Sequence, residues 1–229
     1  MKKLLWLTDN IQNSQSLIAQ IGYTSHIYNI IDFTQKSLYI SEMFSEDFCF
    51  IIHLTNREIS DVFYENLSTL LEERSDTVQC IVITPIGNCF LPVKHRVSEA
   101  LQMCYLYDKT KVIGYSYLLK DNEKCKLQEY DIRNSNVFFQ PIYYDVLSKL
   151  IYASVNQESE HICIYAVSKE SRTLQQKRNF LKSLFNKKKD VHFDNYYTPK
   201  RIESDLCEKI IQNSFSHTRI STPLSTEVK

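Results

Sequence analysis

The sequence predicts an α/β fold in which a parallel sheet is covered by helices on both faces. Continuous apolar runs alternate with segments in which apolar residues recur every three or four positions. Strands that are buried on both faces read as continuous apolar runs, so this alternation is typical of parallel sheets. The clearest runs are FCFIIHL (48–54) and VQCIVIT (78–84), and the clearest amphipathic helix lies at 58–73.

The N-terminal part of the chain supplies the first elements of this pattern. KLLWLT (3–8) predicts a short buried strand, and residues 12–21 predict a helix. Gly22 is expected to end that helix, because glycine readily adopts the left-handed conformation that follows helices. Residues 24–31 predict a second strand.

The remainder of the chain is less regular. Pro141 is expected to open an amphipathic helix, since proline is well tolerated in a first helical turn. The expected elements are helices at 96–107, 142–155, 170–186 and 202–212, and strands at 112–119, 124–130, 136–140 and 161–168.

Shifts in composition predict three parts of the chain. An α/β domain occupies residues 1–157 and contains an enlarged segment at 86–136. A smaller basic α+β region occupies 158–213. Residues 214–229 are polar and rich in Ser and Thr, which predicts a disordered tail.

Composition and charge exclude several classes of protein. Lys and Arg number 27 and equal Asp and Glu, so no overall charge draws the chain to nucleic acid or to an anionic membrane. Only three glycines occur, which disfavours a phosphate-binding loop, because such loops need glycine where the backbone approaches a phosphate. The seven cysteines form no CxxC pair, which predicts reduced thiols in the cytoplasm and neither a disulfide framework nor a metal site. We find no signal peptide and no apolar run long enough to span a membrane.

Five short motifs arrive in the order found in receiver domains of bacterial two-component response regulators. The motifs are LLWLTDN, IGY, FCFIIHL, IVITP and FFQPIYYDVLSKLI. In that family they correspond to the first strand with its acidic pair, the step into the second strand, and the ends of the third, fourth and fifth strands. Residues 1–155 therefore resemble a receiver domain, and the resemblance implies a flavodoxin-like parallel sheet.

The resemblance also implies that most residues of receiver chemistry have been replaced. The acidic pair would fall at Thr8 and Asp9, the phosphorylated Asp at His53, and the Lys-Pro pair at Gln140 and Pro141. A hydroxyl, an imidazole and an amide cannot complete a magnesium site or supply the positive charge that pairs with a phosphoryl group. We therefore expect a receiver-like domain that is not phosphorylated and that needs no metal or other cofactor.

From this resemblance we expect a non-enzymatic regulatory or scaffold protein that binds a protein partner or a second copy of itself. Tyr105, Tyr107, Tyr115 and Tyr117 lie in the segment that departs from the family, and tyrosine is favoured at interfaces. A partly exposed sheet face would explain the same tyrosines.

A DNA-binding regulator is the first alternative. The segment 160–201 carries ten Lys and Arg against four Asp and Glu, an excess that could contact phosphates. Its basic face would comprise Arg178, Lys187, Lys188 and Lys189. A solvated helix face explains these charges equally well.

A nuclease or hydrolase is the second alternative. Asp9, His53 and Thr84 would share the edge of the sheet where ligands bind in open α/β folds, with Asp9 and His53 carrying the chemistry. The competing interpretation is structural. Asp9 would cap the first helix, and His53 and Thr84 would be ordinary polar residues at the ends of their strands.

Overall fold

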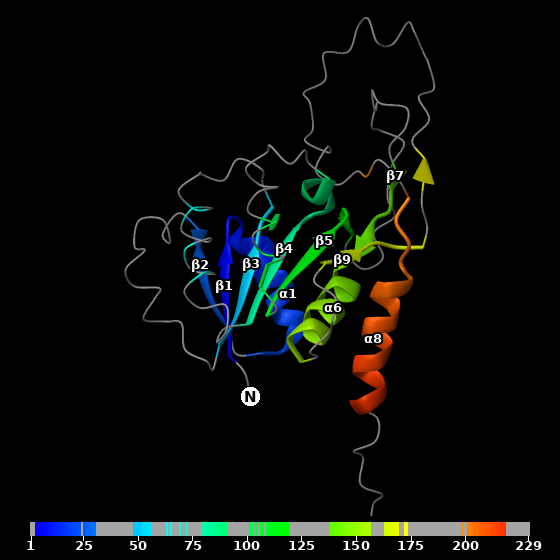
Figure 1. Ribbon diagram of the computed structural model, residues 1–229. Helices are drawn as coiled ribbons and strands as arrows, with labels where there is room; N and C mark the ends of the chain where they lie inside the picture. The colour runs from blue at the N-terminus through cyan, green and yellow to red at the C-terminus, as the bar shows by residue number, and fades with distance from the viewer. Residues whose placement is uncertain are drawn as a thin grey trace, which may run out of the picture.

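The computed structural model describes 3–23, 25–30, 48–55, 79–90, 109–119, 138–156, 163–169, 172–173 and 201–218, and single residues at 63, 65, 69, 72, 101, 102, 104, 106, 107 and 198. A six-stranded sheet forms the centre of this part of the chain (Figure 1). Every pairing within it is parallel. The predicted α/β class with a parallel sheet is confirmed.

The main sheet is built from apolar runs that are buried along nearly their whole length. Its strands are β1 (Lys3–Thr8), β2 (Ser25–Asn29), β3 (Phe48–His53), β4 (Gln79–Pro85), β5 (Thr110–Tyr115) and β9 (Cys163–Ala166). The strand order is β2-β1-β3-β4-β5-β9. Every residue of β5 is buried, and so is every residue of β1 after Lys3, which explains why these sequences show no polar alternation.

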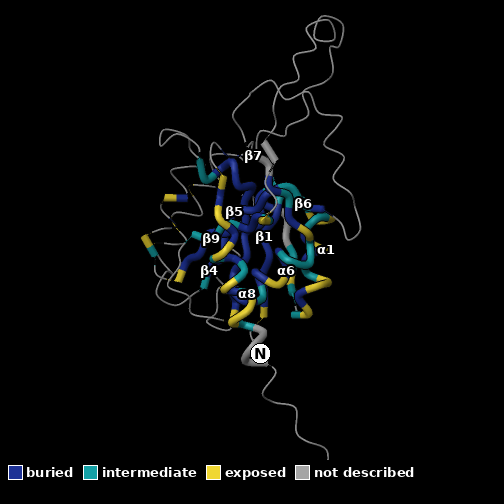
Figure 2. The backbone as a smooth tube through the Cα atoms, turned by 90° about the vertical axis from the view of Figure 1, so that its right-hand side faces the viewer, coloured by how far each residue is buried: buried dark blue, intermediate teal, exposed yellow. Residues whose placement is uncertain are grey.

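Three long helices of the described residues pack on one face of the sheet. They are α1 (Ile11–Ile21), α6 (Tyr144–Asn156) and α8 (Asp205–Thr218), and their apolar residues join Trp6 and Ile51 in one cluster. Figure 1 shows α6 and α8 lying next to each other, and Figure 2 shows that the exposed residues of the helices face away from the buried sheet. Gly22 ends α1 with φ 73°, as predicted, and its N–H donates to the Ile18 carbonyl.

The opposite face of the sheet carries a second apolar cluster. Phe50 and Val82 contribute to it from the sheet, and Phe63 and Leu101 contribute from outside the sheet. The described residues at 63, 65, 69 and 72 are helical, as predicted for 58–73, and so are those at 101, 102 and 104. Helical residues therefore pack on both faces of the sheet.

The prediction that residues 136–140 form the last core strand is wrong. β7 (Phe138–Phe139) pairs antiparallel with β10 (Arg172–Thr173), outside the main sheet. The place beside β4 is taken by β5, whose longer, fully buried run excludes water from both faces.

The segment predicted as one strand at 112–119 is divided between β5 and β6 (Leu118–Leu119). β6 pairs with β8 (Ile142–Tyr143), and the strand predicted at 124–130 lies outside the described residues.

The C-terminal elements complete the same sheet and helical layer. The boundary predicted at residue 157 falls between α6 and β9, and β9 is an edge strand of the main sheet. α8 packs against α6 and continues to Thr218, so residues 214–218 are helical, and 219–229 lie outside the described residues. The segment predicted as a helix at 170–186 contains β10, its only described element.

Candidate active site at the carboxyl edge of the sheet

Two hydroxyls and an imidazole meet at the carboxyl ends of β1 and β3. Thr8 and His53 end these strands as paired neighbours, and Ser14 lies in the first part of α1. Ser14 Oγ is 2.8 Å from Thr8 Oγ1 and 2.7 Å from His53 Nδ1. All three side chains are fully buried. The two predicted strand-end residues are therefore joined by a third that comes from the helix.

The alternation of side chains along the strands decides which polar residues join this cluster. Trp6 and Thr8 share a face of β1, and Ile51 and His53 share a face of β3, the face that α1 covers. Thr84 follows Val82, which belongs to the cluster on the other face. There its hydroxyl accepts a hydrogen bond from Asn88 Nδ2 at 2.8 Å. Thr84 thus lies at the predicted edge but on the opposite side of the sheet from His53.

His53 is electrically neutral at neutral pH. Burial lowers the pKa of its imidazole to about 4, because the charged form loses its hydration there. Two aromatic rings flank it: Trp6 edge-on with ring centroids 6.3 Å apart, and Tyr115 at 5.6 Å. The Tyr115 hydroxyl donates to the Leu54 carbonyl at 3.3 Å, so the phenol is anchored beside the imidazole.

The hydrogen bonds of the cluster assign the proton on His53. Thr8 Oγ1 donates to the Asn10 carbonyl at 3.2 Å and accepts from the Asn10 N–H at 3.0 Å. Ser14 Oγ donates its single proton to Thr8 Oγ1, so Ser14 must accept a hydrogen bond from His53 Nδ1. The neutral ring therefore carries its proton on Nδ1, and Nε2 holds a free electron pair.

Two buried polar atoms on neighbouring rings lack a partner. Within the described part of the chain, neither His53 Nε2 nor Trp6 Nε1 has a hydrogen-bond partner. Buried polar atoms are nearly always paired, and an exception indicates a water or a ligand group. A hydroxyl group has the chemistry that either atom lacks, since it can donate to the bare Nε2 or accept from the indole N–H.

The turn between β1 and α1 is held by its own side chains. Asn10 is the N-cap of α1, and its Oδ1 accepts from the Asn13 N–H at 3.1 Å. Asp9 does not cap the helix. Both of its carboxylate oxygens lie 2.9 Å from the backbone N of Thr55, which follows β3. The turn is thereby tied to the next strand of the sheet.

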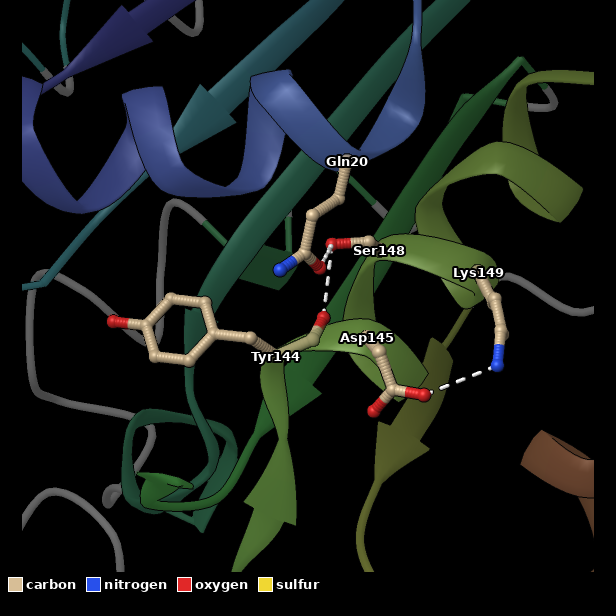
Figure 3. A network of polar contacts seen from close by, with 5 residues as sticks. All are labelled: Gln20, Tyr144, Asp145, Ser148 and Lys149. Carbon is tan, nitrogen blue, oxygen red and sulfur yellow. Dashed lines mark hydrogen bonds and ion pairs between the residues drawn. The ribbon is translucent and has the colours of Figure 1, made fainter. Parts of the chain in front are cut away.

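α1 is also fixed at its other end, which holds Ser14 in register with the sheet. Figure 3 shows Gln20 of α1 reaching Ser148 of α6, with Ser148 Oγ 2.9 Å from Gln20 Oε1 and 2.8 Å from the Tyr144 carbonyl. On the outer side of α6, Lys149 pairs with Asp145 at 3.0 Å.

Of the other predicted site residues, only Tyr115 touches this cluster among those that the structure describes. The buried Gln140 side chain, next to Pro141, bonds to the backbone of Ser168 and Ile202. Tyr115 is buried in the core, and Tyr107 and Tyr117 are partly buried. Tyr105 and the predicted basic face at Arg178, Lys187, Lys188 and Lys189 lie outside the described residues.

Sequence reasoning missed Ser14 and Trp6. Ser14 stands three residues before Leu17 and seven before Ile21, the buried face of α1. A polar residue on the apolar face of a predicted helix was the signal that could have identified Ser14. Trp6 is the chain's single tryptophan and occupies the same strand face as Thr8.

Several other kinds of site are not found in the described part of the chain. No group of three His, Cys, Asp or Glu side chains there is placed to hold a metal ion. The six described cysteines are free thiols. No helix among those residues has the length and apolar character needed to cross a bilayer.

Solved structures identify the fold. The chain is similar to a conserved protein of unknown function from Silicibacter pomeroyi (TM-score 0.54, 11% identity, covering 92% of each chain). It is also similar to the reductase domain of the aureusimine biosynthetic cluster (TM-score 0.52, 12% identity, 98% of this chain and 87% of that one). A third is dTDP-glucose 4,6-dehydratase from Bacillus anthracis in complex with NAD (TM-score 0.51, 9% identity, 76% and 77%). The fold is Rossmann-like. No protein-family model and no curated protein matches the sequence.

The Rossmann-like fold overturns the receiver resemblance. The order β2-β1-β3-β4-β5 is also that of flavodoxin-like sheets, which explains the misleading motif order, but here β9 extends the sheet. The prediction of a non-enzymatic regulatory or scaffold protein is contradicted as well, because the structures that share the fold include a reductase and a dehydratase. None of the functions predicted from the sequence agrees with these similar structures.

The residues of the first turn do not fit the dinucleotide that this fold implies. Rossmann folds hold the pyrophosphate at the turn between the first strand and helix, with glycines that admit it to the helix N-terminus. Here Asp9 and Asn10 form that turn, and the three glycines of the chain lie elsewhere, at Gly22, Gly87 and Gly114. We therefore derive no chemical step through a nicotinamide.

Proposed function

We propose that this protein is an enzyme that acts on a small molecule bearing a hydroxyl or carbonyl group and moves a proton to or from its oxygen without a net change of oxidation state. The observation that carries the proposal is the unpaired His53 Nε2, buried beside the unpaired Trp6 Nε1 at the carboxyl edge of a Rossmann-like sheet. Ligands of open α/β sheets bind at this edge. Dehydration and isomerisation of such substrates both move protons to or from oxygen and need no hydride donor.

In this proposal His53 is the group that exchanges that proton. Its Nε2 accepts the proton of the substrate hydroxyl, while the Trp6 indole N–H donates to the same oxygen. The charge that develops on the imidazole is stabilised through the Nδ1–H bond to Ser14, which Thr8 orients in turn. In the reverse direction the imidazolium returns the same proton to that oxygen.

The lowered pKa of His53 fits a site that opens to bind its substrate. Burial alone lowers it, so admission of a polar substrate raises the pKa back toward the ordinary value. A base whose pKa approaches neutrality is the most effective in proton transfer. Since the side chain is fully buried, substrate entry requires a rearrangement around the edge.

Substrate turnover by matched variants tests the proposal. Purified protein is incubated with dTDP-glucose, other sugar nucleotides and simple hydroxyketones, and products are followed by mass spectrometry. In His53→Asn the amide nitrogen replaces Nδ1 and keeps the bond to Ser14, but no atom replaces Nε2. We expect a loss of about 100-fold or more in turnover. Thr84→Val, which alters the other face of the sheet, should retain turnover.

Two results would contradict this function. One is a folded wild-type protein that neither converts any compound of the panel nor shows a Trp6 fluorescence change with one. The other is a His53→Asn variant that turns over substrate as fast as the wild type.

A further inference from the structure

We infer that the β1–α1 turn is closed by its own side chains to the phosphates of a dinucleotide. A ligand at the carboxyl edge is therefore bound without the phosphate-binding turn that this fold usually provides. The inference concerns the turn at Asp9 and Asn10, and it does not depend on the role proposed for His53.

The first obstacle is at the N-terminus of α1. Phosphates bind helix N-termini because the first N–H groups have no partner within the helix. In this chain Asn10 Oδ1 already accepts from the Asn13 N–H, one of those groups. A phosphate oxygen would have to displace this side chain before it could reach the same N–H.

The second obstacle is the volume of the side chains in the turn. In a dinucleotide-binding turn, glycines permit the tight turn, the approach of the pyrophosphate and the close contact of helix and strand. Here the contact of helix and strand is made by Ser14, which is buried against Thr8 and His53. The space that glycines would leave open is filled by a hydrogen-bonded cluster.

The third obstacle is charge. Asp9 stands between the end of β1 and the helix, and both of its oxygens lie 2.9 Å from the Thr55 backbone N. This bond holds a carboxylate in the turn, where it repels the negative charge of a phosphate. A fixed negative charge is thus part of the turn through which the fold usually receives a phosphate.

Titration with NADH and NADPH tests the inference on the folded wild-type chain. Trp6 lies in β1 three residues before Asp9 of the turn, so a reduced nicotinamide bound nearby would quench its emission by energy transfer. Backbone amide signals of Asn13 and Ser14 report directly on the turn. We expect neither saturable quenching nor movement of these signals.

The two measurements separate the outcomes. Saturable binding that shifts the Asn13 and Ser14 amides overturns the inference, because a nucleotide would then occupy the turn. Saturable binding that leaves both amides in place puts the nucleotide elsewhere and supports a closed turn. The proposed function fails by a different readout, the absence of substrate turnover, so the two failures are distinguishable.

Discussion

The ends of β3 and β4 present two polar residues at one edge of the sheet, yet their surroundings differ. Thr84 is satisfied locally, since Asn88 donates to its hydroxyl one helical turn later. His53 is held from a different element, by Ser14 of α1, and keeps an unpaired Nε2. The position of a residue along a strand sets the edge at which it lies, but the alternation of side chains sets the face. Of these two strand ends, only that of β3 carries an unsatisfied side-chain atom, which marks the face of His53 as the candidate site.

The largest difference in stability should appear in the pH dependence of unfolding. The pKa of His53 is lowered from 6.5 to about 4, so between these values the unfolded chain binds a proton that the folded chain does not. The stabilisation is complete above about pH 6.5 and is lost as pH falls toward 4. The full shift corresponds to about 3 kcal/mol. Denaturant melts across this range should show the loss in the wild type and in Thr84→Val, but not in His53→Asn. Equal slopes in all three would refute the buried, neutral imidazole.

Removing the hydroxyl from each site should sharpen the comparison. Ser14→Ala breaks two hydrogen bonds and leaves the Nδ1–H of His53 without an acceptor, at a cost of about 2 kcal/mol. Thr84→Val breaks the bond from Asn88 and should cost about 1 kcal/mol. Equilibrium denaturation measures both. If Thr84→Val lowered the free energy of unfolding by more than Ser14→Ala, the cluster around His53 would not be the more strongly bonded of the two sites.

The cap of α1 should make a smaller contribution. Asn10→Ala removes the acceptor of the Asn13 N–H and should lower the free energy of unfolding by about 1 kcal/mol. Asn10→Gly should lower it by only a few tenths of a kcal/mol, because glycine is tolerated at helix N-caps. Thermal melts of this pair test the cap, and equal losses in both variants would show that the side-chain bond contributes little.

The smallest effect is expected on the outer surface of α6, away from both strand ends. Lys149 and Asp145 form an ion pair whose side chains are 50% and 42% exposed. Lys149→Ala should change stability by less than about 0.5 kcal/mol, since water and salt screen such pairs. A loss comparable to that of Ser14→Ala would mean that the variants report general damage and not the buried cluster.

Much of the fold could be predicted because its first strands are buried on both faces. β1, β3 and β4 appear as unbroken apolar runs, and α1 ends at Gly22 as expected. The later strands could not be assigned by the same rule. β9 has only four residues, and the apolar FF of β7 looks like a core strand but pairs outside the main sheet.

The candidate site was predicted only in part. Thr8 and His53 could be placed at the carboxyl edge because strand ends are visible in the sequence. The hydrogen bond that Ser14 contributes depends on how α1 packs, which no local pattern specifies. Tyr115 was assigned to an interface from composition, whereas its place on the inner face of β5 buries it beside His53.

Gln140 shows that a residue interpreted as the replacement of a functional lysine can instead be needed for the fold. Its Oε1 accepts from the Ile202 N–H, and its Nε2 donates to the Ile202 and Ser168 carbonyls, so one amide pairs with backbone as a neighbouring strand would. A lysine at this position has three donors and no acceptor, and it would bury a charge while leaving the Ile202 N–H unpaired. The glutamine interpreted from the sequence as a missing lysine is thus a side chain that substitutes for a piece of β-ladder, joining the chain before α6 to the chain before α8.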